Sequence, residues 1–195
     1  MNKSVSNVYL NKIAAKSFEN ATKIPTDSFH DIAGFILKHI PENNYLNILD
    51  LGSGTGRSIL NILDYFNKKE ISFYADCIEV SAYMIEEFEK NKKKFNFNSS
   101  VNLIKNDLNK GIQIERSFDI IIIISVLQYL DNWETILNSL FQKKLKTEGC
   151  LVFAELIGWF RLLDGNFDEE SKAQSEELSY NFWKEYFNKR KLYGD

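Results

Sequence analysis

The chain has 195 residues, of which 44% are hydrophobic and 26% charged, and its formal net charge is -3. This profile is typical of one globular domain whose core is large enough to need no metal or disulfide support. The weakly acidic balance argues against nucleic-acid binding, and no run of 18 apolar residues is present to cross a membrane.

The cysteines and the N-terminus together predict a cytoplasmic protein. Cys77 and Cys150 stand in apolar, strand-like runs, and two cysteines in a chain of this length make no disulfide framework. The first 18 residues contain no apolar stretch long enough for a signal peptide. We therefore expect a reducing compartment and no membrane partner.

The apolar pattern predicts strands that alternate with helices. In chain order we expect helix 28–40, strand 45–51, helix 57–66, strand 71–80, helix 81–95, strands 100–107 and 118–126, helix 131–145 and strand 149–156. The run 118–126 is continuously apolar and β-branched, as in a strand buried on both faces of a parallel sheet. The alternation predicts an α/β fold, a Rossmann-like, doubly wound and mostly parallel sheet.

Three helix starts carry capping signals. Thr26 or Asp27 would cap the first helix, and Ser81 would cap the helix that follows it in the sequence. Asp131 and Glu134 have the spacing of a capping box. These positions fix where we expect the helices to begin.

We predict a single domain, 1–195, with three parts. Region 1–44 is N-terminal and helical, and region 45–155 is the α/β core. Region 156–195 holds an acidic stretch and one further predicted helix, but no strand.

Three glycines join the first predicted strand to its helix. Gly52, Gly54 and Gly56 allow a sharp turn and a close approach to main-chain atoms. The following helix N-terminus offers free N–H groups and partial positive charge. A dinucleotide fingerprint needs its third glycine where this chain has Arg57, so the spacing disfavours an NAD-dependent oxidoreductase. A tight turn without a ligand is the plain alternative.

The motif LDLGSGTG resembles motif I of the class I S-adenosylmethionine-dependent methyltransferases, and three later segments match that superfamily in order. They are CIEVSAYMIEEF, NLIKNDLNKG and FDIIIIISVLQYLDNW. The resemblance implies S-adenosyl-L-methionine as the cofactor. The cofactor-binding residues that it implies are Asp50, Gly52, Ser53, Gly54, Thr55, Gly56, Glu79, Val80, Met84, Asp107, Leu108 and Ser125.

The resemblance also implies roles for five of these side chains. Asp50 would fix the loop and the amino end of the cofactor, and Ser125 would line its methionine end. Glu79 would accept from the ribose hydroxyls, because one carboxylate can accept two hydrogen bonds at once; a solvated Glu is the alternative. Asp107 would bond the adenine amino group. Met84 would cover one face of the adenine, and core packing explains it equally well.

The implied reaction is methyl transfer by in-line displacement. The sulfonium already activates the methyl group, so the protein mainly aligns the partners and excludes water. The N/D-P-P-Y-like phrase of amino-group enzymes and the Pro-Cys nucleophile of cytosine C5 enzymes are both missing. We expect a small-molecule or carrier-bound acceptor. No metal is expected, because His30 and His39 form no ligand spacing with a second His or Cys.

A weaker resemblance points to the malonyl-acyl-carrier-protein O-methyltransferases. The N-terminal helical region is similar to theirs, and VLQYLDNW is similar to their L-x-Q-W loop with Tyr129 in place of Trp. Such an enzyme methylates a carboxylate and needs no base. The acceptor-side candidates follow the fourth and fifth strands, and packing is the alternative for each: Gln128, Tyr129, Trp133, Glu155 and Trp159.

One departure from the superfamily opens a second class of function. The superfamily completes its sheet in the order 3-2-1-4-5-7-6, whereas this chain predicts only 3-2-1-4-5 and no antiparallel pair. The exposed edge of strand five would need a cover: the C-terminal helix, a homodimer partner or another chain, unless the sequence is truncated. The alternative function is a non-catalytic or truncated subunit that binds S-adenosylmethionine.

Overall fold

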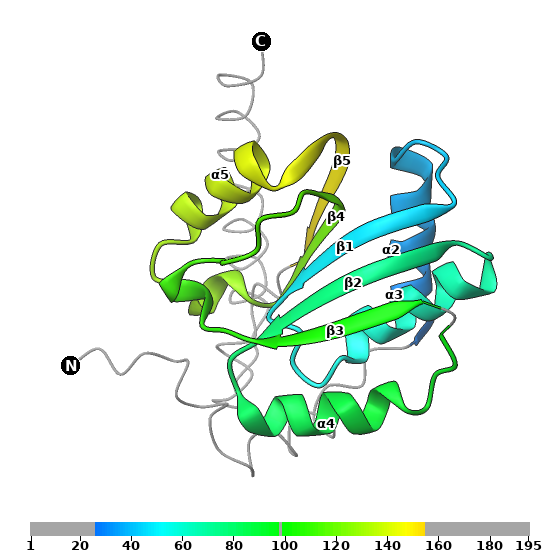
Figure 1. Cartoon of the computed structure of the whole chain (residues 1–195), viewed down its shortest axis with the longest axis horizontal. Coiled ribbons are helices and arrows are strands. Elements are labelled where there is room, and N and C mark those ends of the chain that lie inside the picture. The colour runs from blue at the N-terminus through cyan, green and yellow to red at the C-terminus, as the bar shows by residue number, and fades with distance from the viewer. Residues whose placement is uncertain (1–25, 98, 155–195) are drawn as a thin grey trace, which may run out of the picture. The chain divides into compact units, whose positions relative to one another are not determined.

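The computed structural model describes residues 26–97 and 99–154, which form a parallel sheet flanked by helices (Figure 1). The elements are α2 (Thr26–His39), β1 (Tyr45–Leu51), α3 (Arg57–Lys68), β2 (Ser72–Glu79), α4 (Ala82–Lys92), β3 (Ser100–Lys105), the 3₁₀ turn η2 (Leu108–Lys110), β4 (Phe118–Ile124), the 3₁₀ turn η3 (Leu127–Tyr129), α5 (Trp133–Lys143) and β5 (Leu145–Ala154). The strand order is β3-β2-β1-β4-β5, and every pair is parallel. The predicted α/β fold class and strand order are confirmed.

The composition of β1 and β4 explains why they are central. The four isoleucines 120–123 of β4 have no exposed surface, and Ile48 and Leu49 of β1 are equally buried. Strands covered on both faces read as continuous apolar runs. The two strands pair directly and in parallel, so the loops that follow them lie beside each other.

One layer of helices covers a face of the sheet. Helix α3 buries the apolar positions 59, 60, 62, 63 and 66, the spacing of a single helix face. They pack against strand residues such as Phe73 of β2, together with Phe88 of α4 and Phe29 of α2. Helix α5 contacts β5 and lies apart from that layer (Figure 1).

The start of α5 differs from the sequence prediction. The N-cap is Asn132, with no side-chain cap hydrogen bond, so Asp131 and Glu134 form no capping box. The Asp131 N–H, which a capping-box Glu would accept, donates instead to Asn109 Oδ1 at 2.9 Å. Ser81 caps α4 as predicted, because its hydroxyl accepts the Met84 N–H at 3.3 Å.

Strand β5 begins earlier than the sequence indicates. Leu145 pairs with Phe118 and Cys150 pairs with Ile120, so a bulge separates the two pairs. The residues inside that bulge are polar and interrupt the apolar pattern, so the sequence does not predict that the strand begins at Leu145. In the described part of the chain β5 forms one edge of the sheet, and what covers this edge stays a prediction.

Several predictions concern residues that the structure does not describe. The division of a single domain into regions 1–44, 45–155 and 156–195 stays a prediction. Helix α2 begins at Thr26, so Thr26 and Asp27 lie in its first turn and not at the predicted cap position before it. Within residues 26–97 and 99–154, no helix combines the length and the apolar character needed to cross a membrane.

Candidate functional site

The loops after four parallel strands meet at the carboxyl edge of the sheet. Strands β1, β2, β3 and β4 end at residues 51, 79, 105 and 124. Main-chain hydrogen bonds join the first three ends: the Ser53 N–H donates to Ile78 O at 2.9 Å, and the Asn106 N–H donates to Glu79 O at 3.1 Å. Open α/β sheets bind ligands at this edge, and the motif residues predicted from the sequence lie along it.

The three glycines of the turn have left-handed backbone angles but serve different purposes. Their φ values are 68° at Gly52, 55° at Gly54 and 82° at Gly56. A Cβ on Gly52 would lie 2.5 Å from Val126 Cγ2, and a Cβ on Gly56 would lie 2.7 Å from a ring carbon of Phe88. A Cβ on Gly54 would meet no atom within 4 Å. Packing therefore requires Gly52 and Gly56, whereas Gly54 faces open space.

The Glu79 carboxylate ties the glycine turn to the end of β2. Its Oε2 accepts the Gly54 N–H at 2.8 Å, and its Oε1 accepts the N–H groups of Val80 and Ser81, both at 2.8 Å. The residue is buried, with 7% of its surface exposed. A carboxylate has about four acceptor positions, so three are in use. Acceptance from two ribose hydroxyls, as the sequence suggests, would require the Gly54 N–H to be released.

Asp50 is a buried carboxyl group at the end of β1 that lacks a partner on one oxygen. It is 3% exposed, and its Oδ2 makes no hydrogen bond. Burial raises the pKa of Asp50 from 3.8 to about 7; a hydrogen bond from Ser53 opposes the rise, and the charge of Glu79 adds to it. An unpartnered buried acid is costly for a fold. Such a group is typical of a ligand site.

The remaining residues of the turn and of the loop after β2 are mostly buried. Ser53 and Thr55 are buried, and the Thr55 carbonyl accepts from the Asn91 side chain of α4 at 3.0 Å. Met84 is 3% exposed, which favours its packing role, while Val80 is half-buried. No local sequence signal marks Asn91, because its contact with Thr55 spans 36 residues.

The loop after β3 carries the predicted adenine-side residues. Asp107 caps η2 by accepting the Asn109 N–H at 3.1 Å, and Leu108 is buried. The Lys110 ammonium lies 4.0 Å from Asp107 Oδ2. Asp107 is half-buried, so its carboxylate remains accessible at the edge.

The turn after β4 carries the predicted methionine-side and acceptor-side residues. Ser125 has a φ of 57°, an uncommon conformation for a residue with a side chain. Val126 packs onto Gly52, which brings the turn against the glycine loop. Tyr129 and Trp133 are half-buried. The side chain of Gln128 and the residues Glu155 and Trp159 lie outside the described part of the chain.

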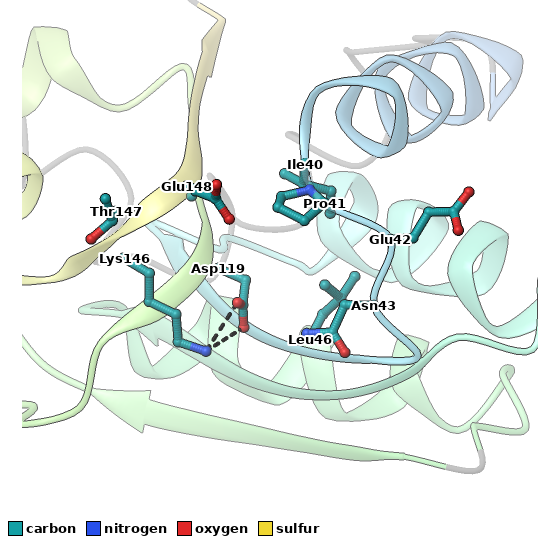
Figure 2. A pocket seen from close by; sticks show the side chains of 10 residues that line it. Ile40, Pro41, Glu42, Asn43, Leu46, Asp119, Lys146, Thr147 and Glu148 are labelled. Atoms are coloured by element: carbon teal, nitrogen blue, oxygen red, sulfur yellow. Dashed lines mark hydrogen bonds and ion pairs between the residues drawn. The ribbon is translucent and has the colours of Figure 1, made fainter.

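An open pocket of about 440 Å³ lies at the opposite, amino edge of the sheet (Figure 2). Its wall includes Asp119, whose two oxygens lie 2.9 Å from the Lys146 ammonium. Asp119 Oδ2 also accepts the Asn47 N–H at 2.8 Å. These charged groups satisfy one another near the start of β1 and β4, whereas Asp50 lies near the end of β1. The pocket is therefore separate from the glycine turn.

A metal centre is not evident in the part of the chain that the structure describes. No group of three or more His, Cys, Asp or Glu side chains among residues 26–97 and 99–154 is placed to hold an ion. His30 packs against Tyr65 with ring centroids 5.5 Å apart, and His39 bonds the Phe35 carbonyl at 2.8 Å. Both histidines lie in α2, before the site in the sequence.

A curated relative matches most of the chain. The malonyl-[acyl-carrier protein] O-methyltransferase of Bacillus cereus is 24% identical over 180 residues, which are 92% of this chain and 63% of that protein. This chain thus spans less than two thirds of the length of that relative.

Solved structures share the fold at low identity. The plantazolicin methyltransferase BpumL, solved with S-adenosylhomocysteine, superposes with a TM-score of 0.61 and 17% identity, covering 89% of this chain and 66% of its own. The [4+2]-cyclase SpnF superposes with a TM-score of 0.52 and 16% identity, covering 65% of this chain and 44% of its own. The two names differ in chemistry, so the fold alone does not fix the reaction.

The family of methyltransferase domains matches residues 49–151, more than half of the chain. The matched region begins just before the glycine turn and ends within β5, so it includes the four strand ends described above. The resemblance to class I S-adenosylmethionine-dependent methyltransferases that the sequence indicates is confirmed, and this chain belongs to the methyltransferase domain family.

Proposed function

We propose that the chain binds S-adenosyl-L-methionine at the carboxyl edge of its sheet and transfers the methyl group to a small-molecule or carrier-bound acceptor. One observation carries the proposal. The glycine turn has open space at Gly54, and the buried carboxyl group of Asp50, just before the turn in the sequence, has one oxygen without a partner. The family match and the relative solved with S-adenosylhomocysteine support the same ligand.

The residues at this edge fit the chemistry of that cofactor. Asp50 offers an unpartnered acceptor to an ammonium group, whose positive charge would offset the cost of ionising a buried acid. Glu79 retains about one acceptor position for a ribose hydroxyl. Asp107 offers a half-buried carboxylate to an adenine amino group.

S-adenosylmethionine supplies a methyl group that its sulfonium already activates, so the chain needs to bind, align and exclude water. The glycine turn gives main-chain access, and Val126 packs the turn after β4 against it. Ser125 and Tyr129 on that turn are the candidates to place an acceptor. No side chain of this set is needed to remove a proton if the acceptor is a carboxylate.

Two observations bear on the acceptor in opposite directions. A relative named a malonyl-[acyl-carrier protein] O-methyltransferase, matching 92% of this chain, supports a carboxylate. The described edge carries the acids Asp50, Glu79 and Asp107, while Tyr129 and Trp133 bring no positive charge. A carboxylate acceptor is the first choice to test, with a neutral or cationic acceptor as the comparison.

The test is release of S-adenosylhomocysteine from S-adenosylmethionine in the presence of a malonyl thioester, an acetyl thioester or a primary amine. We expect turnover with the malonyl thioester and a loss of at least about tenfold in Gly54→Val, whose side chain enters the open space. Turnover only with the amine would overturn the carboxylate acceptor. Binding without turnover of any acceptor would favour the alternative, a non-catalytic or truncated subunit.

A further inference from the structure

The Asn109 side chain joins the loop after β3 to the turn after β4. Asn109 Oδ1 accepts the Asp131 N–H at 2.9 Å, and Asn109 Nδ2 donates to Tyr129 O at 3.4 Å. The Asn109 main-chain N–H donates to Asp107 Oδ1 at 3.1 Å. The main chain of Asn109 thus contacts Asp107, the predicted adenine-binding residue. Its side chain contacts Tyr129 and Asp131 on the predicted acceptor-side turn.

The residue type suits this double contact. An amide side chain carries a donor and an acceptor on one planar group. It can therefore pair with a carbonyl and with the N–H two residues later, as the Tyr129 carbonyl and the Asp131 N–H require. A carboxylate would keep only the acceptor half of the pair, and an apolar side chain would keep neither half.

The turn between these contacts is fixed at its other end by packing. Val126 lies against Gly52 so closely that a Cβ there would clash at 2.5 Å. Ser125 just before it adopts a φ of 57°, which a residue with a side chain holds only when its surroundings impose it. The position of Tyr129 relative to the glycine turn thus depends on Val126 at one end and on Asn109 at the other.

The contribution of Asn109 to folding is expected to be small. Its side chain lies at the exposed edge, and the apolar core does not include it. Surface substitutions away from the core usually change stability little. An exposed amide with two cross-loop hydrogen bonds is better placed to set the position of a loop than to hold the fold.

We propose that Asn109 is a positioning residue that couples the cofactor-binding loop Asp107–Asn109 to the acceptor-side turn Leu127–Asp131. The proposal rests on the proposed function. A ligand that orders Asp107 and Leu108 also orders the main chain of Asn109, and the side chain passes this order to Tyr129 and Asp131. Because such coupling is reciprocal, an acceptor held on the turn would in turn tighten cofactor binding.

The experiment is amide hydrogen exchange of residues 129–131, with and without saturating S-adenosylhomocysteine. It compares the unmodified chain with Asn109→Ala, with Asn109→Asp and with Asn138→Ala, an exposed asparagine on α5 as a matched control. Calorimetry of the same proteins gives the affinity for S-adenosylhomocysteine, and thermal unfolding checks the fold.

We expect the ligand to slow exchange at residues 129–131 in the unmodified chain and in the Asn138→Ala control. In Asn109→Ala, exchange of the Asp131 amide without ligand should be about fivefold faster, since one hydrogen bond is lost. The slowing by ligand should disappear there, while the affinity changes less than about threefold. Asn109→Asp should keep the protection of Asp131, because it retains the acceptor.

Two results would overturn the coupling while leaving the proposed function intact: ligand binding without slower exchange at residues 129–131, or the same slowing in Asn109→Ala. A failure of S-adenosylhomocysteine to bind the unmodified chain would overturn the proposed function itself, and the coupling with it. The calorimetry separates these cases.

Discussion

Replacing Asp50 by Asn should make the ligand-free chain more stable above pH 7 while weakening cofactor binding. Burial raises the pKa of Asp50 from 3.8 to about 7. A raised carboxyl pKa means that the folded state keeps its proton while the unfolded state ionises. The stabilisation is therefore complete below about pH 4, declines as the pH rises, and is lost once the pH passes about 7.

The size of this effect follows from the same shift. A tenfold change in an ionisation equilibrium corresponds to about 1.4 kcal/mol, so the difference between 3.8 and about 7 lowers the free energy of unfolding by about 4 kcal/mol. Asn cannot ionise and removes this loss. The new amide N–H group of Asn would stand where Asp50 Oδ2 has no partner, and leaving this buried donor unpaired lowers the free energy of unfolding by about 1–3 kcal/mol. The net gain at pH 8.5 is about 1–3 kcal/mol.

The assay is urea unfolding of both proteins, without ligand, at pH 5 and pH 8.5. The unmodified chain should lose more stability than Asp50→Asn between the two conditions, by about 3 kcal/mol. Calorimetry at pH 8.5 should show weaker binding of S-adenosylmethionine by Asp50→Asn, because an ammonium group loses its anionic partner. Parallel pH dependences of the two proteins would mean that the pKa of Asp50 is not raised in the folded chain.

Three further predictions concern the stability of the elements around the site. Gly56→Ala should lower the free energy of unfolding by about 3 kcal/mol, because Gly56 has a φ of 82° and an added Cβ would clash at 2.7 Å. Gly54→Ala causes no clash and should lower the free energy of unfolding by about 1 kcal/mol. The same Gly54→Ala change should weaken ligand binding at least about tenfold, because the methyl group enters the open space. Arg116→Ala should lower the free energy of unfolding by about 2 kcal/mol, because the buried Asp76 carboxylate loses its ion pair at 3.2 Å. The loss stays this small because the Arg116 side chain is 43% exposed. Ser81→Ala should cost about 1 kcal/mol through the lost cap of α4. Urea unfolding measures all of these changes, and calorimetry measures the binding.

Each of these predictions has a result that contradicts it. Equal stability losses in the two glycine variants would mean that the ring of Phe88 moves aside from Gly56. No change on removal of Arg116 would mean that Asn102, which donates to Asp76 Oδ1 at 2.8 Å, is sufficient for that carboxylate. An unchanged stability of Ser81→Ala would mean that water replaces the hydroxyl at the helix start.

The sequence predicted the strands because local patterns of apolar residues mark them, whereas the strand order followed from the resemblance to the methyltransferase superfamily. The run of isoleucines in β4 and the glycines after β1 each constrain the backbone within a few residues. The motif order along the chain then brought Asp50, Glu79 and Asp107 to one edge, since parallel strands end together.

The sequence did not reveal features that depend on distant partners. The Asn109 side chain donates to the Tyr129 carbonyl, and no sequence motif marks this contact, which spans 20 residues. The same side chain takes the Asp131 N–H, which is why the predicted capping box is absent. Likewise, sequence spacing gave no sign that main-chain N–H groups fill three acceptor positions of Glu79.

A calorimetric titration of S-adenosylhomocysteine shows whether the carboxyl edge holds S-adenosylmethionine. The titration compares the unmodified chain with Glu79→Ala and uses NAD as a control ligand. We expect micromolar binding, at least about tenfold weaker in Glu79→Ala because a ribose hydroxyl and the Gly54 N–H lose their acceptor, and no binding of NAD. No heat with S-adenosylhomocysteine, or equal affinity in both proteins, would mean that the carboxyl edge does not hold the cofactor.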